Sequence, residues 1–197
     1  MLKSREATLA AIRKAIKESQ RFVFTLGLTE GWINKTEGYT YAMCPGTLAG
    51  DFDPEEHLFK NFSFSEIRTD LVAALRAIRE ADPKIGFLLA VSPVPLTATA
   101  SGEHVLVATT HSKSVLRGVA GEVSGKFGYV DYFPSYEIIT APAFRGMFYE
   151  PNMRSFFACL NGAHGTEDTQ HVKKVAAASS KKTTEVPRRR GRRRTRL

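Results

Sequence analysis

Hydrophobic positions along this chain follow two different spacings, one helical and one strand-like. Three segments repeat apolar residues every three or four positions, as in an amphipathic helix: 4–20, 65–80 and 112–125. Three short apolar runs between them predict strands: 22–26, 85–91 and 129–133. Short runs without polar alternation are typical of strands buried on both faces, as in a parallel sheet.

The order of these segments predicts right-handed strand–helix–strand crossovers and therefore an α/β fold. We expect a three-layer α/β/α arrangement, with helices on both faces of a parallel sheet. Ser65 is a candidate N-cap of the second helix, and Ser112 or Ser114 lies near the expected start of the third. The chain opens on a helix that should follow an earlier strand, so the sheet is expected to be incomplete at the N-terminus.

Residues 31–64 predict a long, turn-rich and irregular connection after the first strand. Connections of this length inside a domain are usually functional or disordered, and the aromatic content of this one favours an ordered structure. Two interpretations of its aromatic side chains stay open: a stacking platform for a saccharide, or a small core that orders the loop. These side chains are Trp32, Tyr39, Tyr41 and Phe52.

The formal net charge of +8 belongs to the C-terminal end of the chain. Residues 171–197 hold eleven Lys or Arg and one acid, whereas residues 1–170 carry a net charge of −2. We expect a folded domain over 1–157 and a low-complexity, disordered basic tail over 158–197. The tail has two interpretations: non-specific binding of nucleic acid through residues 171–197, or the product of a frameshift without selected function.

Other features exclude several classes of protein. No apolar run approaches the length of a membrane span, and the charged N-terminus lacks the apolar stretch of a secretory signal. Cys44 and Cys159 do not make a disulfide framework, which favours a reduced, cytoplasmic protein. His57 lies among acids at a spacing that matches no metal motif, so we expect a solvated loop there, with no metal and no cofactor.

Small polar residues follow each predicted strand. In open parallel sheets, ligands bind beyond the carboxyl ends of the strands, where such residues converge. The alternative is that they only cap helices or form turns. The residues are Gly27, Thr29 and Glu30 after the first strand, Ser92, Thr97 and Thr99 after the second, and Ser135 and Glu137 after the third.

Several long motifs resemble the GSCFA family of bacterial proteins. They are FVFTLGLTEGW, CPGTLAGDFDPEEHLFKNFSF, VSPVPLTATASGEHVLVATTHSKSVLRGVAGE and VDYFPSYEIITAPAFRGMFYEPNMRS. The resemblance covers about residues 5–155. It implies an SGNH-hydrolase-like (flavodoxin-like) fold with a five-stranded parallel sheet, related to esterases and acyltransferases of small ester groups.

The resemblance carries over only in part. The Gly-Ser-Cys-Phe-Ala motif at the nucleophile position is absent from this sequence, so we expect a member truncated upstream of it. The oxyanion block of SGNH enzymes resembles residues 27–30, with Thr29 in the asparagine place. The acid–base block corresponds to residues 152–155, which hold neither acid nor histidine. His104 would serve as a base if it faced Ser92 or Thr29, and is otherwise a surface residue.

The resemblance therefore implies an SGNH-like domain that descends from a serine esterase or acyltransferase and acts on small acyl esters, including those of saccharides. The expected roles are catalytic for Thr29, Glu30, Ser92 and His104, and substrate-binding for Gly27, Thr29, Trp32, Ser135 and Glu137. Because the nucleophile segment is missing, we expect this chain to be impaired as an enzyme. The alternatives are a non-catalytic module that binds a ligand or partner in the same cleft, and a polybasic nucleic-acid binder.

Overall fold

A computed structural model describes residues 2–41, 43–47 and 50–149. The chain divides into two units, Met1–Gly146 and Met147–Leu197. The sheets, helices and pockets presented below belong to the first unit. The predicted tail and the end of the predicted domain lie outside the described residues.

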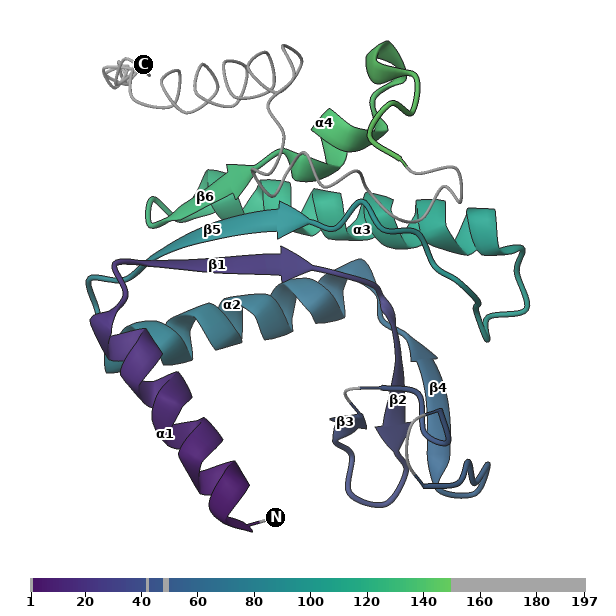
Figure 1. Cartoon of the computed structure of the whole chain (residues 1–197), viewed down its shortest axis with the longest axis horizontal. Helices are drawn as coiled ribbons and strands as arrows, with labels where there is room; N and C mark the ends of the chain where they lie inside the picture. Colours follow the sequence, from purple (N-terminus) through teal and green to yellow (C-terminus); the bar gives the residue numbers. More distant parts are fainter. Residues whose placement is uncertain (1, 42, 48–49, 150–197) are drawn as a thin grey trace, which may run out of the picture. The chain divides into compact units, whose positions relative to one another are not determined.

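A three-stranded parallel sheet forms the centre of this unit. Its strands are β1 (Arg21–Leu26), β5 (Gly86–Val91) and β6 (Val130–Phe133), in the order β1-β5-β6 (Figure 1). Leu26 pairs with Val91, and Ala90 pairs with Phe133, so the carboxyl ends of the three strands lie at one edge. All three strands predicted from the apolar runs are confirmed, and the α/β fold class with them.

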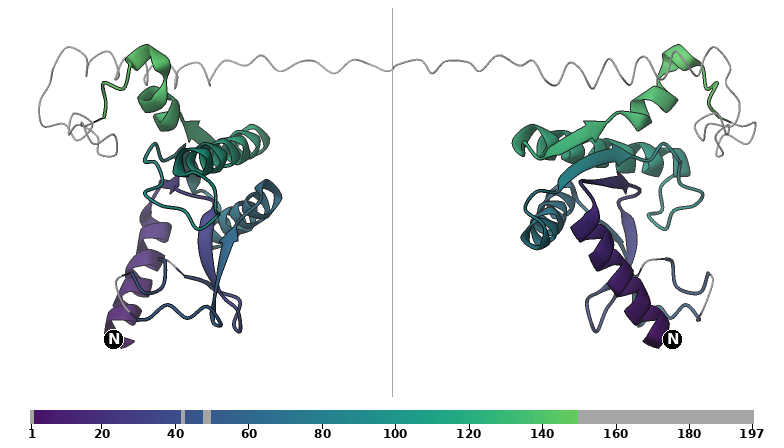
Figure 2. Two further views of the ribbon diagram at one scale, coloured as in Figure 1. Left: turned by 90° about the vertical axis from the view of Figure 1, so that its right-hand side faces the viewer. Right: turned by 60° about the vertical axis from the view of Figure 1, so that its left-hand side comes forward.

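Two long helices cover one face of the parallel sheet. α2 (Phe64–Ala81) and α3 (Val105–Lys126) lie on the same side of it in both views of Figure 2. Alternate residues of β5, which share one face of the strand, pack against their apolar stripes. The buried cluster joins Phe87, Leu89 and Val91 of β5, Leu71 and Leu75 of α2, and Leu116, Val119 and Val123 of α3.

The remaining helices are α1 (Leu2–Glu18), α4 (Ser135–Thr140) and a 3₁₀ turn at Pro142–Phe144. The opposite face of the sheet is partly open to solvent, as the 63% exposure of Val23 on that face shows. Arg21 crosses this face to form an ion pair with Asp131 at 3.1 Å. Its side chain passes over Gly86, where a Cβ atom would come within 2.6 Å of the guanidinium.

Both long helices begin at residues other than those expected. Ser63, not Ser65, is the N-cap of α2, in a capping box with Glu66. α3 begins at Val105 with His104 as its N-cap, so Ser112 and Ser114 lie two turns inside the helix. The first turns of α3 carry apolar residues on their solvent-facing side; Leu106, for example, is 66% exposed. These turns therefore lack the amphipathic pattern that predicts a helix from sequence.

The prediction that residues 31–64 are irregular is wrong. They contribute to an antiparallel sheet of β2 (Glu30–Asn34), β3 (Thr40–Tyr41) and β4 (His57–Asn61), in the order β3-β2-β4. Polar and glycine residues in these short strands obscured the period of two. The segment is nevertheless ordered, as its aromatic content indicated.

No helix in the described part of the chain combines the length and apolar character that crossing a bilayer requires.

Candidate functional site

Polar groups just beyond the strands hold the strand ends together. The backbone N–H of Ser92 donates to the carbonyl of Leu26 at 2.9 Å, and the hydroxyl of Ser135 donates to the carbonyl of Val91 at 3.0 Å. Ser92 Oγ also accepts the N–H of Val94 at 3.3 Å. The structure thus brings the ends of β1, β5 and β6 together, with both serines bonded to backbone.

The turn after β1 is fixed by two buried side chains of α3. The Lys113 ammonium donates to the carbonyl oxygen of Gly27 at 2.7 Å, and Ser112 Oγ accepts the N–H of Thr29 at 2.9 Å. Both side chains, and Thr29 itself, are almost completely buried. Thr29 Oγ1 has no hydrogen-bond partner among the described residues. The proposed oxyanion segment is therefore tied to α3, and its backbone N–H at Thr29 is already used.

Burial also changes the chemistry of Lys113. Desolvation lowers the pKa of its ammonium from 10.5 to about 8, because the charged form loses hydration inside the protein. The sequence predictions did not include this residue, although the helical spacing carries a signal for it. Continuing the buried stripe of α3 back from Leu116 by three or four residues reaches Lys113 and Ser112, two polar residues at core positions.

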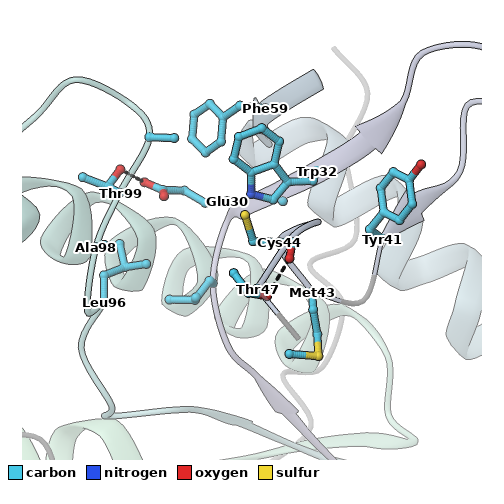
Figure 3. Close-up of a pocket in the computed structure, with 13 residues that line it drawn as sticks. Glu30, Trp32, Tyr41, Met43, Cys44, Thr47, Phe59, Leu96, Ala98 and Thr99 are labelled. Atoms are coloured by element: carbon cyan, nitrogen blue, oxygen red, sulfur yellow. Dashed lines mark hydrogen bonds between the residues drawn. The ribbon is translucent and has the colours of Figure 1, made fainter. Parts of the chain in front are cut away.

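Residues that follow β1 and β5 line a pocket of about 480 Å³. One wall comes from the antiparallel sheet and includes Glu30, Trp32 and Phe59, and another comes from residues 96–100 of the loop after β5 (Figure 3). Thr99 Oγ1 donates to Glu30 Oε1 at 2.6 Å and so joins the two walls. Two predicted residues, Glu30 and Trp32, therefore share a pocket at the sheet edge.

Aromatic rings of the antiparallel sheet form a connected row beside this pocket. The ring of Trp32 lies 5.5 Å from that of Phe59 and 5.2 Å from that of Phe52, with both pairs edge-to-face. The row continues from Phe52 to His57 and from there to Tyr41. The rings order the long segment by packing together, and those of Trp32, Tyr41 and Phe59 also line the pocket.

His104 lies away from the buried cluster. Its Nδ1 accepts the N–H of Leu106 at 3.3 Å, which uses the ring to cap α3. It lies eight positions before Ser112, so a helical rise of about 1.5 Å per residue places it roughly 12 Å along the axis from the contact with Thr29. The structure thus does not bring His104 to Thr29.

Glu137 is occupied by two neighbours. Its carboxylate forms a short ion pair with Arg117 of α3 and accepts the hydroxyl of Tyr132 at 2.8 Å. Burial and this hydrogen bond raise the pKa of the Tyr132 hydroxyl above its usual range, so it remains a donor. These contacts fix α4 against α3 and β6.

His57 is buried on β4, so the expectation of a solvated loop there is wrong. Its Nδ1 accepts the N–H of Asp53 at 3.0 Å, which leaves the proton of the neutral ring on Nε2. Cys44 lines the pocket near Trp32, and also a second pocket that includes His57.

Over the described ranges, no group of three or more His, Cys, Asp or Glu side chains is placed to hold a metal ion.

A comparison with known protein families identifies the family of this chain. The model of the GSCFA family matches residues 1–159, most of the chain. This chain belongs to the GSCFA family. No curated protein matches it, and no solved structure does.

Membership of the GSCFA family confirms the resemblance seen in the motifs and leaves the reaction open. One further prediction, the altered acid–base block at 152–155, falls outside the described residues. Of the proposed catalytic set, Thr29 lies in the turn after β1, Glu30 is the first residue of β2, Ser92 follows β5, and His104 caps α3.

Proposed function

We propose that this GSCFA domain binds a small acyl ester in the pocket beside Glu30 and Trp32. The observation that carries the proposal is the place of this pocket, because its walls begin at residues that follow β1 and β5. Open parallel sheets bind their ligands at such a position. Its volume of about 480 Å³ suits a small ligand.

Ester hydrolysis or acyl transfer is the reaction class that kinship with SGNH-like enzymes suggests. The described residues support ligand binding better than this reaction. The Thr29 backbone N–H is bonded to Ser112, and the Nδ1 of His104 is bonded to backbone at the start of α3. We therefore propose that the module binds its ester without a serine-dependent reaction of its own.

A binding experiment tests the first half of the proposal. Trp32 is the single tryptophan of the chain, so its fluorescence reports directly on the pocket. Acetyl esters of a saccharide and of a small alcohol should change this emission in a saturable way. Trp32→Ala should abolish the binding heat in calorimetry without changing the circular dichroism spectrum.

Leu106→Ala provides the matched control, because Leu106 is exposed on α3 and does not line the pocket. This variant should bind the esters as the unaltered chain does. If no ester binds to the chain, or if Trp32→Ala binds as tightly as the unaltered chain, the proposed pocket is wrong.

A kinetic experiment tests the second half. We expect no turnover of a chromogenic acetyl ester beyond the rate in buffer, with or without a serine-directed phosphonate. Turnover that the phosphonate abolishes would show that the chain retains a reactive serine, and would favour the esterase over the binding module.

A further inference from the structure

The charge distribution around the pocket points to the chemistry of its ligand. Side chains alternate along β2, so Glu30, Trp32 and Asn34 project from one face of the antiparallel sheet. Their register partners on β4 are Asn61, Phe59 and His57. One face of this sheet therefore presents a carboxylate next to a row of aromatic rings.

The Glu30 carboxylate is the single charged side chain that lines the pocket in the described part of the chain. Its Oε1 is held by Thr99, whose hydroxyl also lies 2.8 Å from that of Ser101. These neutral partners orient the carboxylate and leave its charge uncompensated. A carboxylate without a basic neighbour attracts a cation more than a neutral or anionic group, so a cationic ligand would gain the most there.

The adjoining pocket strengthens the same preference. It has a volume of about 520 Å³ and shares Tyr41, Met43, Cys44 and Thr47 with the first. Asp51 and Glu56 are its charged residues, next to His57. Among the described residues, neither pocket is lined by a lysine or an arginine. Anionic ligands are therefore disfavoured along this whole face.

The aromatic rings that line the pocket also favour a positively charged ligand. An ammonium group over the face of a tryptophan is attracted by the negative π surface of the ring, and the attraction grows when the pair is desolvated. Trp32 lies between Glu30 and Tyr41 in Figure 3, and all three line the pocket. An ammonium seated near the Glu30 carboxylate would thus meet both a countercharge and an aromatic ring.

We infer that the ligand is an acyl ester whose carrier bears an ammonium group, seated between the Glu30 carboxylate and the Trp32 ring. This inference rests on the proposed function and specifies its ligand. It goes beyond it by assigning Glu30 a role in selecting charge, whereas the resemblance alone suggested catalysis for this residue.

Two esters of the same shape test the assignment. Acetylcholine and 3,3-dimethylbutyl acetate differ in that a quaternary nitrogen in the first is a carbon atom in the second. Titration of the full chain, followed by Trp32 fluorescence and confirmed by calorimetry, should show acetylcholine binding about tenfold more tightly. Raising the ionic strength should weaken acetylcholine binding and leave that of the neutral ester unchanged.

Two variants complete the design. Glu30→Gln keeps the shape of the side chain and removes its charge, so the affinity for acetylcholine should fall about tenfold while that for the neutral ester changes less than about twofold. Glu80→Gln, at an exposed position of α2 outside the pocket, should change neither affinity.

The outcomes separate the inference from the proposed function. If both esters bind equally, or the neutral ester binds more tightly, the pocket binds esters but the assignment of an ammonium is wrong. An unchanged preference for acetylcholine in Glu30→Gln would also overturn it. If neither ester binds, the pocket is not an ester site at all, and the proposed function fails as well.

Discussion

The ammonium of Lys113 on α3 donates a hydrogen bond of 2.7 Å to the carbonyl oxygen of Gly27, the first residue after β1. Lys113 is 1% exposed whereas Gly27 is exposed, so the bond joins a buried side chain to a turn at the surface. It connects the helix that covers the sheet with the turn that leads to Glu30 and Trp32. The position of one pocket wall therefore depends on a buried, titratable group.

The buried ammonium predicts a specific dependence of stability on pH. Its pKa is about 8 in the folded protein and 10.5 as the reference value, so between these pH values the unfolded chain binds more protons. The free energy of unfolding should therefore rise from pH 8 to pH 10.5, by about 3 kcal/mol for a shift of this size. Urea denaturation of the chain and of Lys113→Met at several pH values measures the difference.

Lys113→Met supplies the reference, because every other group titrates in both proteins. Below pH 8 the difference in stability between the two should be constant. A difference that stays flat through pH 10.5, or that changes in favour of Lys113→Met, would show that the folded ammonium keeps its ordinary pKa.

Removal of the Ser112 hydroxyl should destabilise the turn after β1. In Ser112→Ala the buried N–H of Thr29 loses its acceptor, and an unsatisfied buried donor costs about 1–3 kcal/mol. Ser114→Ala changes an exposed residue of the same helix and should stay within about 0.5 kcal/mol of the unaltered chain. Equal effects of the two substitutions in urea denaturation would contradict the role given to Ser112.

Two serines two residues apart should differ in their contribution to α2. Ser63→Ala removes a capping box and should lower the free energy of unfolding by about 1 kcal/mol. Ser65→Ala should have a smaller effect, because Ser65 lies inside the helix and its hydroxyl is paired with that of the capping serine, at 3.2 Å. Thermal denaturation of both variants measures this, and a larger loss for Ser65→Ala would favour the cap expected from the sequence.

The basic residues 171–197 lie outside the described structure, and their binding to nucleic acid remains a prediction. If they bind through charge alone, the affinity for any single-stranded oligonucleotide should fall steeply and log-linearly with salt. Replacing the six arginines at 188–190 and 192–194 by glutamine should abolish binding at physiological salt. Unchanged affinity in that variant would assign the binding to the folded domain, whereas no binding by either protein would favour the frameshift interpretation.

The sequence predicted an element correctly where burial produced a clear run or spacing of apolar residues. The runs around Phe24, Leu89 and Tyr132 are strands, because each places apolar side chains in or beside the core of a parallel sheet. Glu30 and Trp32 were expected in the segment after the first strand, and both line the pocket. Local patterns of this kind depend on neighbours along the chain, which a sequence displays.

Other features depend on contacts between distant residues. Helical spacing places Lys113 on the buried stripe of α3, but the acceptor of its ammonium, the carbonyl of Gly27, lies 86 positions earlier and is not evident from the sequence. Thr99 was expected at the carboxyl edge of the sheet, but its bond to Glu30, 69 positions away, is evident only from the structure. The role of His104, a base or a surface residue, stayed open because the sequence pattern began the third helix at 112, whereas α3 begins at Val105 with His104 as its N-cap.

The two sheets also differ in how far apart along the chain their paired residues lie. In the antiparallel sheet Ile33 pairs with Thr40, while in the parallel sheet Leu26 pairs with Val91. Closing a longer loop costs more chain entropy, and non-local pairing slows folding. We therefore expect the β2–β3 hairpin to form early and the β1–β5 pairing to form late. The two walls of the pocket would then meet only near the end of folding.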